Sequence, residues 1–153
     1  MFSNEDQVKA IGLMSQNELC LAELYNVYAG KFPEAGEFWR KMAKEEEGHA
    51  RILKNFQEGL KIGELVSRDR VFSSNVYESI TYIKGKIAEA REKPLTLKDA
   101  LVIGDLLESS FLEEAYFRVV AGDSSRFRSG IISLVQDTER HKALLKDMLQ
   151  CLI

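Results

Sequence analysis

Apolar residues recur at three- and four-residue spacing along almost the whole chain, and only Pro33 and Pro94 interrupt the pattern. Residues three or four apart share one face of an α-helix, so this spacing predicts a series of amphipathic helices. No segment shows the alternation of apolar and polar residues that is typical of a half-buried strand. The sequence therefore predicts an all-α fold.

Capping and turn residues divide the first half into two long helices. We expect the first helix to begin near Ser3, with Asp6 as its capping partner, and to end at the turn AGKFP. Pro33 suits a first helical position, so a second helix should begin there and end at Gly59 or Gly63. These two helices would form an antiparallel hairpin.

The second half repeats this plan after a long connection. Residues 64 to 95 should form a crossover that contains one shorter amphipathic helix, over 74–90. Thr96 can cap a third long helix, and the turn AGDSS should lead into a fourth. We therefore expect residues 1–153 to form one domain, a four-helix bundle of two hairpins joined by a crossover with an extra helix.

Length and charge exclude several classes of protein. The chain has 153 residues, enough for a single domain with a core of its own. Its net charge of -3 is spread without a basic stripe, which argues against nucleic acid and lipid surfaces as partners. We expect neither an export signal nor a membrane span, and therefore a cytoplasmic protein. Cys20 and Cys151 stand too far apart to indicate a disulfide framework or a zinc ribbon.

Charged residues nevertheless occupy apolar helix faces. The segment KEEEGHARIL places Glu46 and His49 one turn apart, between the apolar residues Met42 and Leu53. His141, the only other histidine, has the equivalent position in the fourth helix. Apolar or aromatic residues likewise surround Glu18 in the first helix and Glu108 in the third, at helical spacing: Met14, Leu21 and Tyr25 around the former, Leu101, Phe111 and Leu112 around the latter.

These inward polar residues indicate a metal site. Buried carboxylates close together repel one another unless a cation or a proton neutralises them. One glutamate from each of two helices, with Glu-x-x-His from each of the other two, is the pattern by which a helical bundle binds two metal ions. The first Glu-x-x-His is complete, whereas the second has Thr138 where a glutamate is expected.

The chain resembles the rubrerythrin branch of the ferritin-like superfamily over nearly all of its length. The segments that carry the resemblance are ELCLAELY, EEGH, LTLKDALVIGDLLE and RHKALL. It implies a dinuclear centre, usually of iron, that reacts with peroxide or dioxygen in a cytoplasmic homodimer. The rubredoxin-like module of the family is absent from these 153 residues. Electrons would therefore come from an external donor.

The resemblance also implies roles for individual residues. Glu18 and Glu108 would be terminal carboxylates, Glu46 a bridging carboxylate, and His49 and His141 one imidazole ligand for each metal. Catalysis would take place at the metal centre itself, with two iron ions as the expected cofactor and manganese or zinc as alternatives.

Thr138 leaves three carboxylates to face the four positive charges of two divalent ions. Asp137, four residues before His141, and Asp105, one turn before Glu108, are candidate substitutes. Glu139 should be on the opposite side of the helix and face water. Hydroxide or a bound anion would also supply the missing charge.

Each of these residues also has an ordinary structural interpretation. The glutamates and histidines could form a hydrogen-bonded polar layer without metal. Tyr25 and Tyr116 are more typical of packing than of a relay, and Trp39 with Phe38 would be core or a dimer contact. The charge runs that contain Glu45, Glu47, Glu113 and Glu114 should face water.

Three functions therefore remain. The chain could be a diiron oxidoreductase of the peroxidase or ferroxidase type, a protein that stores or buffers metal without turnover, or a degenerate bundle that acts as an interaction scaffold.

Overall fold

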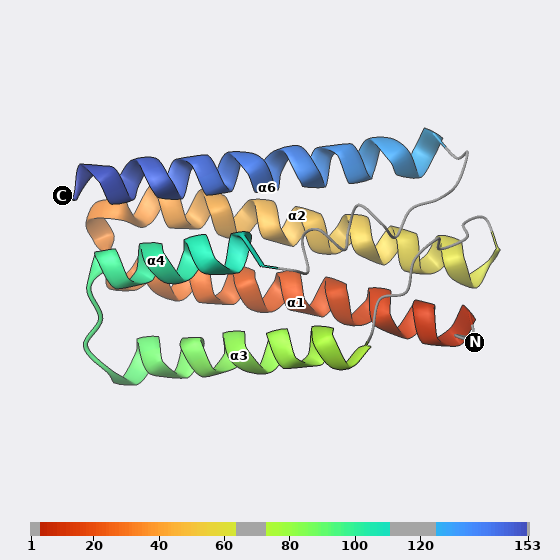
Figure 1. Ribbon diagram of the computed structural model, residues 1–153, viewed down its shortest axis with the longest axis horizontal. Helices are drawn as coiled ribbons and strands as arrows, with labels where there is room; N and C mark the ends of the chain where they lie inside the picture. The colour runs from red at the N-terminus through yellow and green to blue at the C-terminus, as the bar shows by residue number, and fades with distance from the viewer. Residues whose placement is uncertain (1–3, 64–72, 111–124, 153) are drawn as a thin grey trace.

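The computed structural model describes residues 4–63, 73–110 and 125–152, and all the regular structure in these ranges is helical. Figure 1 shows the helices running lengthwise, with the chain termini at opposite ends. The elements are α1 (Asn4–Lys31), a 3₁₀ helix η1 (Pro33–Ala35), α2 (Gly36–Lys61), α3 (Ser73–Glu92), α4 (Leu97–Glu108) and α6 (Ser125–Cys151). The prediction of an all-α fold is confirmed.

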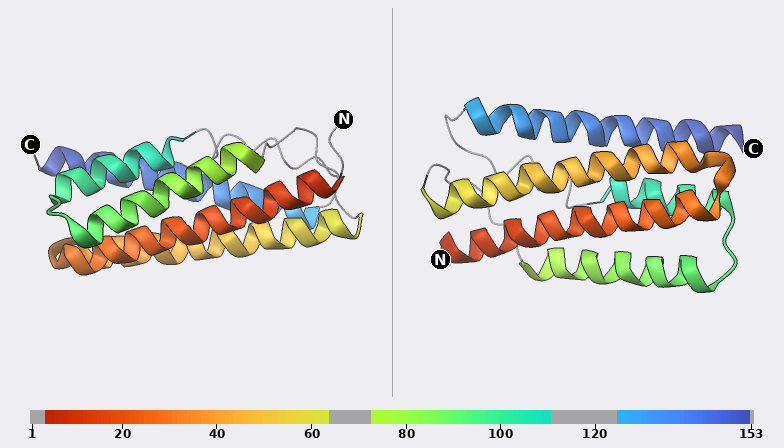
Figure 2. Two further views of the ribbon diagram at one scale, coloured as in Figure 1. Left: turned by 90° about the horizontal axis from the view of Figure 1, so that it is seen from below. Right: turned by 180° about the vertical axis from the view of Figure 1, so that it is seen from behind.

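The helices pack side by side around α1 and α2: α1 runs antiparallel to α2, and α2 runs antiparallel to α6, whereas α3 runs in the same direction as α1 (Figure 1). α1 contacts both α2 and α3, and α6 contacts both α2 and α4. The two views of Figure 2 show that α3 lies along the side of α1 that faces away from α6. Four helices, α1, α2, α4 and α6, can therefore contribute side chains to one shared interior.

The α1–α2 hairpin forms as predicted, with a small shift at its turn. Pro33 begins the 3₁₀ helix rather than α2, which starts three residues later at Gly36. The N–H of Ala35 bonds to the carbonyl of Phe32 at 2.9 Å, so the turn is tighter than an α-helical start would allow. α2 passes through Gly59 and ends at Lys61, and Gly63 follows with a φ of 76°, a value that favours glycine.

The shorter helices also follow the sequence. α3 buries the predicted apolar side, which consists of Val76, Ile80, Ile83 and Ile87. Thr96 caps α4 as predicted: its hydroxyl accepts from the Asp99 N–H at 3.1 Å, and the Asp99 carboxylate accepts from the Thr96 N–H at 3.2 Å. α4 ends at Glu108, where the N–H of Ser109 bonds to the carbonyl of Asp105 at 3.0 Å.

Several predictions lie outside the described residues. They concern the helix start at Ser3, the turn AGDSS, and the residues Phe111, Leu112, Glu113, Glu114 and Tyr116.

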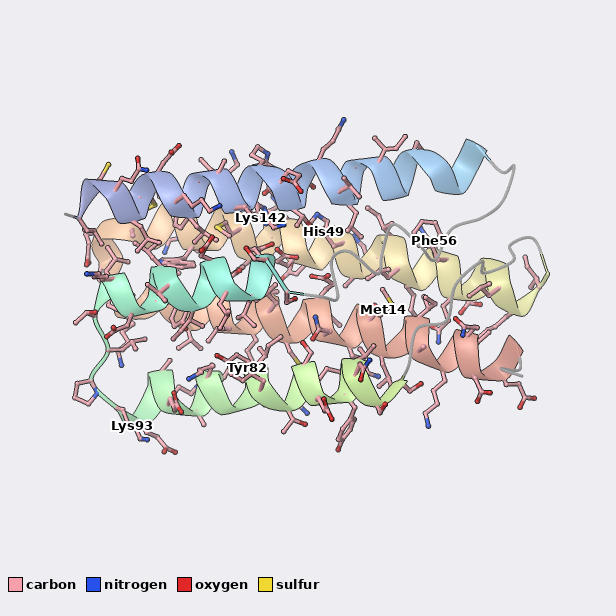
Figure 3. All side chains as sticks on the ribbon, viewed as in Figure 1. Met14, His49, Phe56, Tyr82, Lys93 and Lys142 are labelled. Carbon is pink, nitrogen blue, oxygen red and sulfur yellow. The ribbon has the colours of Figure 1, made fainter. Side chains whose placement is uncertain are left out.

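The core has two apolar parts. One surrounds Trp39 at the α1–α2 turn, and the other surrounds Phe56 toward the start of α1. Trp39 has no exposed surface, which confirms its assignment to the core. Figure 3 shows His49 on α2 between Phe56 and the turn, at the level where the two apolar parts meet. No helix among the described residues is long and apolar enough to cross a membrane.

Candidate metal centre

Five polar residues meet inside the molecule between the two apolar parts. α1 contributes Glu18, α2 contributes Glu46 and His49, α4 contributes Glu108, and α6 contributes His141. Their exposed fractions are 3% for Glu18, 0% for His141 and 1% for each of the other three. All five residues that the sequence indicated as inward-facing are therefore buried together.

The five residues form two groups that share one member. Glu18, Glu46 and His49 each offer one oxygen or nitrogen atom, and these atoms all lie within 4.8 Å of one another. Glu46, Glu108 and His141 meet the same criterion. The two imidazole rings are 5.9 Å apart between centroids. Glu46 thus occupies the shared position between two sets of candidate ligands.

The inner nitrogen of each histidine faces the shared glutamate. His49 Nδ1 lies 2.9 Å from Glu46 Oε2, and His141 Nδ1 lies 3.0 Å from Glu46 Oε1. His141 Nδ1 is also 3.2 Å from Glu108 Oε1, which accepts a hydrogen bond from the Tyr25 hydroxyl at 2.7 Å. Glu46 Oε1 is fully buried and, within the described part of the chain, has no partner at hydrogen-bonding angles.

The outer nitrogen of each histidine faces a carboxylate from the other of the two helices α2 and α6. His49 on α2 contacts Asp137 of α6, with 2.9 Å between Nε2 and Oδ2. His141 on α6 contacts Glu45 of α2, with 2.6 Å between Nε2 and Oε2. Arg140 joins the two carboxylates, at 2.9 Å from Glu45 Oε1 and 3.0 Å from Asp137 Oδ1. These contacts fix both rings, since each nitrogen has a defined neighbour.

The outer carboxylates correct two details of the sequence analysis. The expectation that Glu45 faces water is wrong, because it is half-buried and paired with His141. Asp137 reaches the site as suggested, but it contacts the outer nitrogen of His49 and belongs to neither ligand group. One sequence feature does indicate that Glu45 lies near the site. It stands four residues before His49, just as Asp137 stands four residues before His141.

The remaining residues that the sequence places near the site differ in burial. Thr138 is buried on α6, with 6% of its surface exposed. Asp105 is in neither ligand group, and its buried Oδ1 has no hydrogen-bond partner among the described residues. The prediction for Glu139 is confirmed, because 67% of its side chain is exposed. Glu47 is partly buried on the outer side of α2.

The electrostatics of the site favour added positive charge. Burial, together with the nearby charge of Glu108, raises the pKa of Glu46 to about 7. Burial lowers the pKa of His141, but the hydrogen bonds and charges of Glu108 and Glu46 outweigh it and raise that pKa to about 11. In both cases the cause is the same: carboxylates are crowded into a buried space where a cation is stabilised.

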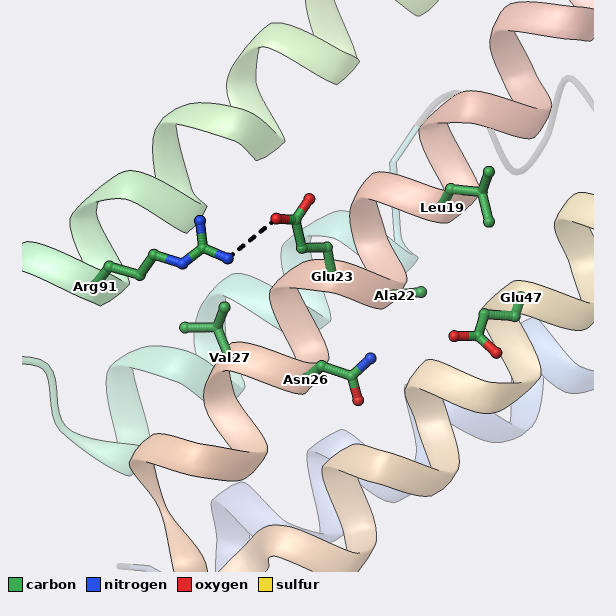
Figure 4. A pocket seen from close by; sticks show the side chains of 7 residues that line it. All are labelled: Leu19, Ala22, Glu23, Asn26, Val27, Glu47 and Arg91. Carbon is green, nitrogen blue, oxygen red and sulfur yellow. Dashed lines mark hydrogen bonds and ion pairs between the residues drawn. The ribbon is translucent and has the colours of Figure 1, made fainter.

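Two hollows on the described surface lie elsewhere. One pocket of about 360 Å³ lies over the outer face of α1 and α2, where Arg91 pairs with Glu23 at 3.1 Å (Figure 4). A neighbouring groove of about 580 Å³ follows the same two helices and shares Leu19 and Glu47 with the first. Neither is lined by any of the five buried residues, so these hollows are not the candidate site.

Comparisons of the chain with protein-family models, curated proteins and solved structures found no match. The resemblance to rubrerythrins therefore stays a prediction made from the residues.

Proposed function

We propose that this chain holds two transition-metal ions, iron in the first place, between Glu18, Glu46, His49, Glu108 and His141. The observation that carries the proposal is the pair of buried ligand groups that share Glu46. Each group offers one imidazole and two carboxylates, a nitrogen and oxygen donor set that suits iron, manganese or zinc. Three carboxylates in an apolar interior would be costly without such a cation.

The orientation of Glu46 supports a bridging role. Its Oε2 faces His49 and its Oε1 faces His141, so each oxygen addresses a different half of the site. A carboxylate that bridges two ions presents its oxygens in this way. Oε1 lies 3.0 Å from His141 Nδ1 without the angles of a hydrogen bond, and a bound ion would give it a well-directed partner.

The outer carboxylates support the same proposal. A histidine ligand commonly donates its second ring N–H to a carboxylate, which fixes the tautomer and the direction of the ring. When Nε2 of His49 donates to Asp137 and Nε2 of His141 donates to Glu45, both Nδ1 lone pairs point to the carboxylate cluster. Asp137 and Glu45 would then orient the two ligands rather than bind metal.

The proposed activity is reduction of peroxide or dioxygen by electrons from an external donor. The metal ions, when bound, would supply the redox chemistry. The chain's own residues bind and orient them, and the two apolar parts of the core keep bulk water away from the reaction. Three carboxylates leave one positive charge of two divalent ions unmatched, and Thr138 adds none. An anionic oxidant or hydroxide would therefore be attracted to the site.

The remaining family properties belong to this proposal. We propose a cytoplasmic location, a homodimer and a ferritin-like arrangement. In that arrangement α1–α2 and α4–α6 are two hairpins joined by the segment that carries α3. Buffering of metal without turnover is the second candidate. The observation that favours it is the replacement of the fourth carboxylate by Thr138, which removes a ligand on the α6 side.

Metal titration tests the proposal. The purified chain should bind two Mn²⁺ or Fe²⁺ ions, and Glu46→Gln should lose at least one because both groups use this residue. Glu139→Gln, an exposed change on α6, is the matched control and should bind as the parent does. Two ions bound with unchanged affinity by Glu46→Gln would refute the shared position of Glu46. Consumption of peroxide with a chemical reductant separates an enzyme from a buffer.

A further inference from the structure

A row of positive charges lies on the outer face of α2. Four exposed cations are spaced by four, seven and three residues, which places them on one stripe of the helix: Arg40, Lys44, Arg51 and Lys54. The chain as a whole has a net charge of -3, so this row does not follow from the overall composition. α2 therefore presents a basic stripe on a protein that is acidic overall.

Few carboxylates oppose these cations. Glu37 stands at one end of the basic stripe, three residues before Arg40, and Glu58 stands at the other end. Glu58 pairs with Lys61 at 3.3 Å. Glu47 lies within the stripe and is half-buried. The middle of the stripe therefore keeps an excess of positive charge that can attract an anionic partner.

The surface beside the basic stripe is hollow and partly apolar. Arg51 and Lys54 line the groove of about 580 Å³ between α1 and α2. Leu19 of α1 and Glu47 of α2 line it as well (Figure 4), and Leu19 is 51% exposed. Protein interfaces commonly surround an apolar centre with a polar rim. This face therefore suits a partner that has an apolar contact bordered by carboxylates.

The basic stripe and the candidate metal centre lie on opposite sides of the same helix. Glu46 and His49 stand in sequence between Lys44 and Arg51, but both are buried in the interior. A helix with its side chains is about 10–12 Å across, so a partner on the stripe is about one helix diameter from these ligands. A carrier whose redox group lies near its surface would be within range of electron tunnelling to the centre.

We infer that the outer face of α2 is the docking surface of the external electron donor, and that this donor is a small acidic electron-carrier protein. The inference rests on the proposed function for the fate of the electrons. Each docking passes one electron from the reduced carrier to the oxidised centre. Two electrons from two carriers, with two protons from solvent, convert one hydrogen peroxide into two water molecules. The basic stripe speeds the encounter and orients the carrier.

Binding of a carrier to the metal-free protein tests the docking surface separately from catalysis. The probes are two acidic one-electron carriers in their oxidised forms, a [2Fe–2S] ferredoxin and a flavodoxin. Calorimetric titration should show binding of at least one of them. This binding should weaken as salt is added, because salt screens exposed charges. Absence of binding to both carriers at low salt, or binding that salt does not weaken, would overturn the inference.

Charge reversal locates the surface. Lys44→Glu combined with Lys54→Glu should weaken carrier binding by about tenfold or more, because two attractive charges become repulsive. Lys84→Glu combined with Lys98→Glu is the matched control, since it changes the net charge equally at exposed positions of α3 and α4. The control should bind within about twofold of the parent, because distant exposed charges are screened. Equal losses in both double variants would mean that net charge alone explains binding, and thermal melts check that both fold.

Peroxide consumption by the metal-loaded protein gives a second readout. The Lys44→Glu, Lys54→Glu variant should need more reduced carrier to reach half of its maximal rate, while its rate with a small uncharged reductant stays that of the parent. An unchanged dependence on the carrier would contradict the docking surface. Carrier binding without any metal binding would refute the proposed function, whereas metal binding without carrier binding would refute the present inference alone.

Discussion

Asp137→Asn and Glu45→Gln should each weaken metal binding without removing a ligand. Both changes keep the size of the side chain but replace the carboxylate that orients His49 or His141 with an amide. An amide can donate from its N–H₂ group to Nε2 of the ring. This favours the tautomer that carries its proton on Nδ1, so Nδ1 no longer has a lone pair for a metal ion. The inner face of the imidazole then no longer suits a metal ion.

The size of the effect follows from the role of these contacts. Loss of a carboxylate that orients a histidine ligand typically costs about 10- to 100-fold in metal affinity. When the free metal concentration exceeds the dissociation constants of both the parent and the variant, this loss of affinity removes ~1.4 to 2.7 kcal/mol of the stability gained on metal binding. For a domain of this size, 1 kcal/mol corresponds to roughly 2–4 °C in Tm. We therefore expect the metal-induced rise in Tm to shrink by about 3 to 10 °C.

Calorimetric titration with Mn²⁺ and paired thermal melts, with and without the metal, measure this effect. Comparing the two melts of one variant removes any loss of stability that is independent of metal. Glu139→Gln again serves as the control, since it changes an exposed carboxylate two residues from Asp137. If both outer variants bind Mn²⁺ as tightly as this control, the outer carboxylates do not orient metal ligands and this reasoning is wrong.

Three further predictions concern the site and the helix that carries Glu108. Metal at a few hundred times its dissociation constant should stabilise the parent by about 3 kcal/mol or more, and superimposable melts would instead favour a scaffold. Thr138→Glu would supply a fourth carboxylate, so titration should show tighter binding of the second metal ion, and unchanged affinity would mean that position 138 does not face the site. Thr96→Ala should lower the free energy of unfolding by about 1 kcal/mol in urea denaturation through loss of the α4 cap, whereas an unchanged midpoint would contradict that role.

Helical periodicity predicted the described helices well because each helix buries one apolar face. The spacing of the apolar residues on that face is visible within the helix's own sequence. It located the α3 core residues for the same reason, whereas the Thr96 cap was predicted from the capping preference of threonine. It misplaced the start of α2 because Pro33 is equally suited to the first position of a 3₁₀ turn. The extent of the third long helix beyond Ser110 lies outside the described residues.

The inward-facing residues of the site could be predicted for a similar reason, but their partners could not. A polar residue surrounded by apolar neighbours at helical spacing must point inward, and this holds for Glu18, Glu46 and Glu108. The contact between Asp137 and His49 depends instead on how α6 is rotated and shifted relative to α2. Spacing within one helix carries no information about that register. Glu45 was missed because its neighbours Lys44 and Glu47 suggested a charged surface face.

The exchange of outer carboxylates makes the two halves of the site depend on each other. The α1–α2 hairpin supplies Glu18, Glu46 and His49, yet the carboxylate that orients His49 comes from α6. His141, the proposed ligand on α6, is likewise oriented by Glu45 of α2. Two independent metal sites would not require a carboxylate of α2 to orient a histidine of α6, nor a carboxylate of α6 to orient a histidine of α2. With Glu46 shared and the outer carboxylates exchanged, neither half can be oriented until α2 and α6 have packed together, so assembly of the ligands should be coupled to folding of the whole interior.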